Sequence, residues 1–346
     1  MAAINNPKNR RRPATLREVA EAAGVSVMTV SNVVRGKSVR PETRQSVEDA
    51  IAKLRYRPNT SARRLRLAAQ FSVGIVIADT DQSFLADPFI SRVVSGLSNY
   101  LSALDYTLDV QGVSPERFEH ATILGKVGND ALCAILCGPR ELRRRHLAHL
   151  QRLGQPVVVF QESFPSPSKN VALVRQDDLT GGRLLGQHLA RRKLRSVLFL
   201  KPLLEWCAVE QREQGLRDAL AKASAPVELD AQFVPSEAFD DVVSVVTQRL
   251  SIRVPSAIVA ATDSMAAAAL KAVEAMGLRV PKDLTMAGFN GFDVYRYTSP
   301  TLTTVISPAY EMGHLGGELI IERLNTGQFS RRNVVLDVSL QPGESS

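Results

Sequence analysis

The sequence has few cysteines, few aromatic residues and no long apolar run. Its three cysteines are an odd number, and Cys133 and Cys137 lie in the apolar segment A-L-C-A-I-L-C, which is typical of a buried strand. We therefore expect inert buried thiols and neither a disulfide nor a zinc site. No apolar run reaches the roughly 18 residues that a membrane helix needs, and the first residues lack the apolar stretch of a secretory signal. These absences predict a cytoplasmic protein without a membrane span.

The sequence also lacks the motifs of several enzyme classes. It contains no phosphate-binding G-x-x-x-x-G-K-[ST], no G-x-G-x-x-G after a strand, no H-E-x-x-H and no G-x-S-x-G. The five histidines share no metal-ligand spacing, and His146 and His149 are expected on a solvated helix face beside the exposed arginines 143–145. These features predict that the protein is not an enzyme and holds no metal or cofactor.

Charge is distributed unevenly along the chain. Residues 1–70 contain 15 Lys+Arg and 5 Asp+Glu, a net charge of +10, whereas the rest contains 28 and 30, a net charge of −2. A strongly basic segment of this kind is typical of proteins that bind a polyanion such as nucleic acid. At 346 residues the chain is also too long for one ordinary core, so two or three compact units are expected.

The basic segment predicts two short helices in succession. Thr15 and Glu18 have the form of a capping box, which should begin a helix over 16–23. A glycine then suits the turn, because glycine tolerates a positive φ. Ser26 can cap a second helix over 27–34. This spacing is typical of a helix-turn-helix.

A third, amphipathic helix is predicted from Pro41, with a buried stripe of Val47, Ile51 and Leu54. Pattern alone leaves open a generic three-helix module for protein contacts. The charge asymmetry favours nucleic-acid binding instead.

From residue 71 onward, strand-like Val/Ile/Leu runs alternate with amphipathic helices. Such runs are typical of parallel sheets that are covered by helices on both faces. The β-α units are too many for one sheet, so we expect two lobes with a ligand cleft at the carboxyl ends of the strands. The predicted fold class is an all-α helix-turn-helix head plus an α/β body with two doubly wound parallel-sheet lobes.

The chain resembles the lactose/galactose repressor (LacI/GalR) family of bacterial transcription factors from about Thr15 to Pro342. Its most specific matches are T-L-R-E-V-A-E-A-A-G-V-S-x-x-T-V-S, the segment Y-R-P-N, and S-P-T-L-T-T-V after A-G-F. Supporting matches are R-E-Q-G-L-R-D-A-L and T-D-S-M-A-A-A-A-L. The resemblance implies a body like the periplasmic sugar-binding proteins, with chain crossovers between its two lobes.

The domain boundaries that follow are expectations. They comprise a disordered basic arm over 1–14, a helix-turn-helix domain over 15–57, a hinge helix and linker over 58–70, and an effector-binding and dimerisation domain over 71–346. Within the last domain, the N-lobe would comprise about 71–174 and 304–329, and the C-lobe about 175–303 and 330–346.

The resemblance also implies which residues contact DNA. Val27, Met28 and Asn32 occupy recognition-helix positions that face base edges. Many family members have Arg where this chain has Asn32; Arg pairs with guanine whereas Asn favours adenine, so the operator should differ there. Candidate phosphate contacts, which set register rather than sequence, are Thr15, Ser26, Thr29, Ser31 and Thr43.

The hinge is expected to contact DNA as well. Asn59 can cap a short hinge helix, and Leu65 matches a family leucine that wedges into the minor groove. Arg63 and Arg64 would neutralise flanking phosphates, and Tyr56 lies at the hinge entry. A flexible basic linker is the alternative interpretation.

Carried over by position, the effector contacts would be Gln161, Arg212, Thr262 and Asn290, with Phe289 close by. Relatives that bind neutral sugars commonly have acidic residues where Gln161 and Asn290 stand. Retention of Arg212 favours a sugar acid or a phosphorylated sugar, because guanidinium binds carboxylate or phosphate bidentately. Two further segments are similar to gluconate-operon repressors. The alternative is that Arg212 makes a structural ion pair and the ligand is neutral.

The resulting hypothesis is a homodimeric, operator-binding repressor of carbohydrate or sugar-acid catabolic genes that a small effector controls. The alternatives are a sugar-binding transport receptor and a corepressor-dependent regulator of another metabolite pathway. The basic N-terminal segment argues against a transport receptor, because such a receptor does not bind a polyanion.

Overall fold

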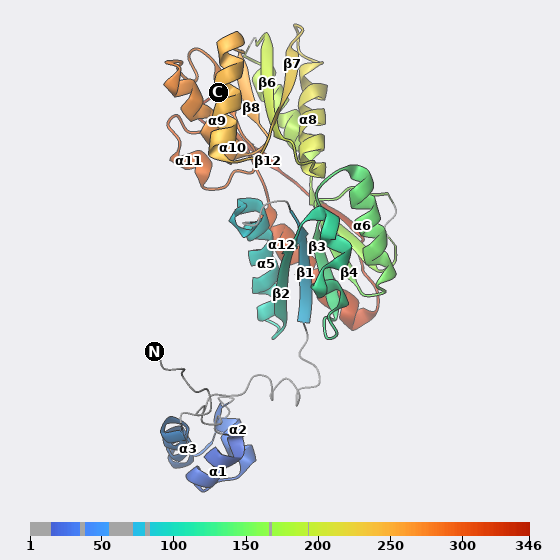
Figure 1. Cartoon of the computed structure of the whole chain (residues 1–346), viewed down its shortest axis with the longest axis vertical. Coiled ribbons are helices and arrows are strands. Elements are labelled where there is room, and N and C mark those ends of the chain that lie inside the picture. Colours follow the sequence, from blue (N-terminus) through green and yellow to red (C-terminus); the bar gives the residue numbers. More distant parts are fainter. Residues whose placement is uncertain (1–14, 35–38, 55–71, 80–83, 166–167, 193) are drawn as a thin grey trace, which may run out of the picture. The chain divides into compact units, whose positions relative to one another are not determined.

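The computed structural model describes residues 15–34, 39–54, 72–79, 84–165, 168–192 and 194–346. The chain forms two compact units, Met1–Gln70 and Phe71–Ser346, whose elements are labelled in Figure 1. No helix within the described residues is long and apolar enough to cross a membrane. The predicted basic arm and the predicted hinge contacts lie outside the described residues, namely Tyr56, Asn59, Arg63, Arg64 and Leu65.

The first unit contains the three helices that the sequence predicts, α1 (Leu16–Ala23), α2 (Val27–Val34) and α3 (Pro41–Leu54). The capping box at the start of α1 is present, and Gly24 ends α1 with a φ of 65°. The three helices are held together by a small apolar core of Val19, Ala20, Val30, Val33, Val47 and Ala50. Ile51 and Leu54 pack against this core while partly exposed.

The second unit begins with a parallel sheet, the first sheet, in the order β11-β5-β4-β3-β1-β2. Its strands are β1 (Ser72–Ala78), β2 (Thr107–Val113), β3 (Ala131–Ile135), β4 (Val157–Phe160), β5 (Val171–Gln176) and β11 (Asn333–Leu336). Its helices are α5 (Pro88–Ser102), α6 (Arg140–Arg152) and α12 (Ala309–Thr326), with short 3₁₀ helices η1 (Phe84–Ala86), η2 (Pro115–His120) and η3 (Thr122–Gly125). We call this sheet and its helices the first lobe.

Alternate residues of the first sheet pack into two different cores. Val73, Ile75 and Ile77 of β1 share one core with residues of α5 and α12. Val76 and Ala78 share the other with residues of α6. Because side chains alternate along a strand, one continuous apolar run serves both faces. With both faces covered, the carboxyl ends of the strands remain as the edge where polar groups collect.

A second, four-stranded parallel sheet has the order β7-β6-β8-β9. Its strands are β6 (Ser196–Pro202), β7 (Glu228–Val234), β8 (Ala257–Ala260) and β9 (Thr285–Ala287), and an antiparallel pair, β10 (Thr304–Ile306) with β12 (Ser339–Gln341), lies beside it. The helices are α7 (Asp178–Ala190), α8 (Cys207–Leu220), α9 (Phe239–Ile252), α10 (Asp263–Ala275) and α11 (Val294–Tyr297). These elements form the second lobe, drawn at the top of Figure 1.

The later crossovers between the lobes differ from the sequence prediction. The prediction assigns 304–329 to the first lobe, but β10 pairs with β12 and Ile306 bridges to Asn290, so β10 belongs with the second lobe. It assigns 330–346 to the second lobe, but β11 pairs with β5 in the first sheet. Strands of three or four residues carry too little periodicity to reveal which sheet they join.

Helices α7 and α8 cross closely at glycines. A Cβ atom on Gly182 would lie 2.2 Å from the carbonyl oxygen of Arg212, and one on Gly215 would lie 2.1 Å from that of Leu179. A side chain cannot approach backbone atoms so closely, so the helix spacing requires glycine at both positions. This crossing holds Arg212 on α8 against Asp178 at the start of α7.

Candidate functional site

The exposed start of α2 forms the first candidate site. Val30 and Val33 point into the core of the first unit. Val27 and Met28 therefore lie on the outer side of α2, with 39% and 69% of their surface exposed. Both side chains are therefore accessible to a partner that approaches the start of α2. These are two of the residues that the sequence assigns to base contacts.

Of the other predicted DNA contacts within the described residues, Thr15, Ser26, Thr29 and Thr43 lie at helix starts, whereas Ser31 and Asn32 lie further along α2. Ser26 accepts a hydrogen bond from the Thr29 N–H group at 3.1 Å, and their side-chain oxygens are 2.9 Å apart. Unpaired N–H groups at helix starts favour phosphate oxygens. Partly exposed side chains complete the set, at Thr15, Ser31, Asn32 and Thr43.

The second candidate site is a buried polar network between the lobes, which we call the interlobe network. It consists of Gln161, Gln176, Asp178, Arg212 and Asn290, all of which are buried. Arg212 Nε donates to Asp178 Oδ1 at 2.8 Å, and Arg212 Nη2 donates to Asn290 Oδ1 at 3.1 Å. Gln161 Nε2 donates to Asp178 Oδ2 at 3.2 Å. The network joins residues that follow strands of both sheets, where ligands bind in such folds.

The other two predicted effector residues, Phe289 and Thr262, lie beside the interlobe network. The Arg212 guanidinium lies 3.8 Å from the centre of the Phe289 ring, a cation–π contact, and its Nη1 donates to the Ala261 carbonyl at 2.7 Å. The next residue, Thr262, donates its hydroxyl hydrogen to Glu237 Oε2 at 2.9 Å. The structure thus brings all five predicted effector residues into one region.

Two of these residues have unusual backbone conformations. Gln161 has a φ of 57° and Asn290 a φ of 107°. Residues other than glycine rarely adopt these φ values, and such backbone strain is concentrated at functional positions. Both residues are therefore held in place by the fold rather than by local preference.

Several acidic groups that were not predicted from the sequence surround Arg212. Asp87, Glu237 and Asp263 line a cavity of 20 Å³ together with Thr262 and Asn290. Burial, and after it the neighbouring Asp87 carboxylate, raise the pKa of Glu237 to about 7, against a lowering hydrogen bond from Thr262. Burial also raises the pKa of Asp263 to about 7, against a lowering hydrogen bond from the Thr304 hydroxyl.

The sequence offered only weak signals for the acidic residues around Arg212. Glu237 comes after β7, whose sequence E-L-D-A-Q-F-V contains no continuous apolar run. Asp178 stands in a pair of aspartates at a helix start, which is typical of capping. The expectation of an arginine free to bind an anion is corrected by the ion pair with Asp178, so the alternative of a structural ion pair holds.

Helix α6 also differs from its prediction. Arg143 and His146 were expected on a solvated face, but they are 1% and 0% exposed. The His146 ring stacks on Phe118 with the ring centres 4.4 Å apart. Arg143 pairs with Glu162 in the first lobe at 2.8 Å and with Glu210 of α8 at 3.3 Å. A bridge between the lobes explains the burial of this arginine, and no short-range pattern encodes it.

The buried carboxyl group of Glu162 should make the free energy of unfolding depend on pH. Burial raises its pKa to about 7, although Arg143 lowers it, whereas an unfolded glutamate has a pKa of about 4.3. The folded chain therefore binds a proton at Glu162 more tightly than the unfolded chain does. The stabilisation that this proton gives to the fold is complete below about pH 4 and is lost as the pH rises through 7. We expect the free energy of unfolding to fall by up to about 3 kcal/mol over that range.

Denaturant unfolding at a series of pH values, followed by the fluorescence of the single tryptophan, Trp206, measures this effect. Glu162→Gln is expected to flatten the profile between pH 5 and pH 8. An identical slope in the variant would mean that other groups carry the dependence.

Both compact units match families of known proteins. Residues 15–59 match the model of bacterial regulatory proteins of the lacI family, and residues 187–346 match a periplasmic binding protein-like domain. The chain is 30% identical to the HTH-type transcriptional regulator CelR of Thermobifida fusca, over 98% of this chain and 99% of that protein.

Solved structures agree with this assignment. A transcriptional regulator CelR-cellobiose complex superposes with a TM-score of 0.69 at 28% identity, covering 97% of this chain and 100% of that one. The lac repressor dimer bound to operator and the anti-inducer ONPF gives a TM-score of 0.76 at 25% identity, covering 96% and 99%.

These matches run through the helical unit and both lobes, and the relatives that they identify are transcriptional regulators rather than enzymes. The predicted fold class is confirmed, with a helix-turn-helix unit followed by an α/β body of two parallel-sheet lobes. The chain therefore belongs to the lacI family of DNA-binding bacterial transcriptional regulators.

Proposed function

We propose that the protein is a homodimeric repressor of carbohydrate catabolic genes that binds a near-palindromic operator. The observation that carries the proposal is the exposed start of α2, where Val27 and Met28 lie in a segment with a net charge of +10. Positive charge supplies affinity for the phosphate backbone, and side chains at the start of a recognition helix supply sequence preference. The similar lac repressor was solved as a dimer on its operator, which supports two such helices acting together.

Asn32→Arg tests the recognition helix. An arginine at this position should change the preferred base from adenine to guanine at one position of each half-site. The binding free energy should then favour guanine over adenine by about 1–3 kcal/mol. Selection of binding sites from random duplex DNA measures the change.

Gln45→Arg is the matched control, because it adds the same charge to the exposed surface of α3. It should raise affinity for all duplexes without changing the preferred bases. An unchanged selected sequence in Asn32→Arg would place Asn32 outside the base-reading set.

The effector that we propose for the interlobe network is a neutral sugar. Arg212 is already neutralised by Asp178, and the surrounding carboxyl groups of Asp87, Glu237 and Asp263 disfavour an anion. Carboxylates accept hydrogen bonds from hydroxyl groups, and Phe292 lines the same cavity with an apolar ring. The similar regulator CelR was solved as a complex with cellobiose, which supports a sugar as the effector.

A sugar is larger than the 20 Å³ cavity beside Thr262, so its binding must displace side chains or separate the lobes. A ligand that prefers one lobe arrangement shifts the population toward it, and operator binding must shift effector affinity by the same factor. This coupling would let the sugar control repression.

Titration calorimetry with cellobiose, ribose, glucose and gluconate tests the effector class. We expect a neutral sugar to bind and Glu237→Gln to weaken it about 10-fold, the effect of losing a charged hydrogen bond. Glu274→Gln, on the exposed side of α10 beside Lys271, is the control. Competitive displacement of the sugar by gluconate would instead favour the sugar-acid regulator.

A further inference from the structure

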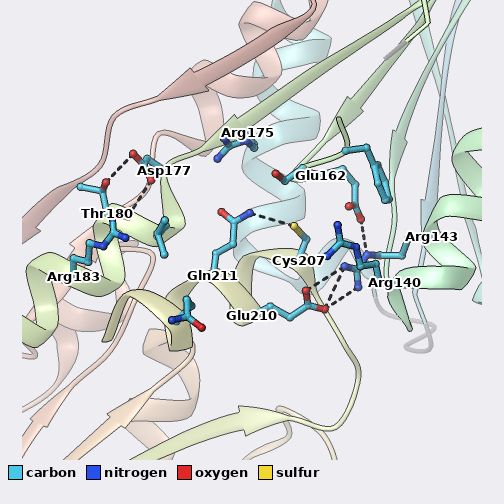
Figure 2. Close-up of a pocket in the computed structure, with 14 residues that line it drawn as sticks. Arg140, Arg143, Glu162, Arg175, Asp177, Thr180, Arg183, Cys207, Glu210 and Gln211 are labelled. Atoms are coloured by element: carbon cyan, nitrogen blue, oxygen red, sulfur yellow. Dashed lines mark hydrogen bonds and ion pairs between the residues drawn. The ribbon is translucent and has the colours of Figure 1, made fainter. Parts of the chain in front are cut away.

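A large cavity lies between the lobes beside the interlobe network. Its volume is 630 Å³, and it is lined by the starts of α6, α7 and α8 and by residues at the ends of β4 and β5. Figure 2 shows Arg175, Gln211 and Arg143 around the same space. We call it the arginine cavity because four arginines line it, namely Arg140, Arg143, Arg175 and Arg183.

The arginine cavity and the interlobe network are distinct. Glu162, Asp177 and Gln211 line the cavity. Their immediate neighbours in the sequence, Gln161, Asp178 and Arg212, form the network instead. Adjacent residues thus supply the two sites, and none of the network residues lines the cavity.

Two of the four arginines are neutralised within the protein. Arg143 pairs with Glu162 and Glu210. Arg183 pairs with Asp218 at 2.8 Å. Their charges are accounted for without a ligand.

The other two arginines, Arg140 and Arg175, have no acidic partner among the described residues. Arg175 is the more informative, because it lies on strand β5 and its Nε atom is shielded from solvent without a hydrogen-bond acceptor in the described part of the chain. A buried guanidinium nitrogen without an acceptor costs free energy. An anion in the cavity would neutralise the charge of this guanidinium group, which lines the cavity.

Two helix starts add to the positive potential of the cavity. Helix α6 follows Pro139 and α8 follows Trp206, and neither helix has a side-chain cap. Arg140 and Cys207, their first residues, both line the cavity. Uncapped starts of helices this long present N–H groups and a partial positive charge to the cavity.

We propose that the arginine cavity binds a small metabolite through a carboxylate or phosphate group held by Arg175 and Arg140. Gln211, Gln214 and Thr180 line the same cavity and can bond the hydroxyl groups of such a ligand. The ligand contacts residues of both lobes, because Arg175 belongs to the first lobe and Gln211 to the second. This site is separate from the proposed sugar site and does not depend on it.

Calorimetry on the full chain at constant ionic strength tests the proposal with inorganic phosphate, gluconate and glucose 6-phosphate, and with glucose as the uncharged probe. We expect at least one of the three anions to bind. Arg175→Gln should weaken that binding at least about 10-fold, since charged bidentate contacts are among the strongest polar contacts. Comparing phosphate with gluconate separates a phosphate ligand from a carboxylate ligand.

Arg140→Gln is the second variant, because this residue is exposed and its replacement leaves the sheet intact. Arg144→Gln is the matched control, on the same helix, 62% exposed and paired with Glu141. We expect weakening by Arg140→Gln and none by Arg144→Gln. The proposal is overturned if none of the three anions binds the unmodified chain. It is also overturned if both Arg175→Gln and Arg140→Gln bind the anion as tightly as the unmodified chain does.

Discussion

Replacing Arg212 by methionine is expected to lower the free energy of unfolding of the body by about 3–5 kcal/mol, the cost of leaving a buried charge without its partner. Asp178 is 3% exposed and its carboxylate accepts the Arg212 Nε–H bond at 2.8 Å. Burial raises the pKa of Asp178, and Arg212 is the main group that lowers it. Without Arg212, the carboxyl group must take up a proton or remain charged in a buried site.

A double-mutant cycle distinguishes a lost ion pair from lost packing. Asp178→Asn removes the charge that Arg212 balances while keeping a similar shape, so Arg212→Met should cost less in that background. Denaturant unfolding followed by Trp206 fluorescence measures each variant. Trp206 suits the purpose because it packs against the cores of both lobes.

Arg217→Met is the matched control for this cycle. It lies on the same helix, is 49% exposed and pairs with Glu213 one turn away, so its replacement should change stability by less than about 1 kcal/mol. Additive effects of Asp178→Asn and Arg212→Met would contradict a coupled buried pair.

Replacing Gly215 by alanine is expected to destabilise the body by about 1–3 kcal/mol, the usual cost of overpacking. The added Cβ would lie 2.1 Å from the Leu179 carbonyl oxygen and 2.8 Å from the Arg183 nitrogen, so α8 must move away from α7. That movement separates Arg212 from Asp178. We therefore expect weaker sugar binding as well as lower stability.

Thermal unfolding and sugar titration of the same variant measure both effects. Gly125→Ala is the control, because a Cβ atom there meets no atom within 4 Å. Gly125→Ala should leave stability and affinity close to those of the original chain. Full stability in Gly215→Ala would show that the two helices can separate at little cost.

The sequence predicted local features well because local interactions determine them. The bounds of α1 and α2 follow from the capping box at Thr15, the cap at Ser26 and the glycine between them. Apolar runs likewise revealed most strands of both sheets, since each run packs on both of its faces.

Long-range features could not be predicted in the same way. The partner of Arg212, Asp178, lies 34 residues away, and that of Arg143, Glu210, lies 67 residues away. Their pairing depends on the crossing of α7 with α8 and on the contact between lobes. The same reason explains why β10 and β11 were assigned to the wrong lobes, since a strand of three or four residues is too short to indicate which sheet it joins.

The order of the strands has a consequence for biosynthesis. Strands β11 and β12, at residues 333–341, contribute one strand to each lobe, so neither lobe can be completed until the ribosome has nearly finished the body. The three helices of residues 16–54 need nothing that is made later for their own core. Domains fold as they are synthesised. A product of early termination would therefore contain a folded helix-turn-helix unit joined to an incompletely folded α/β body.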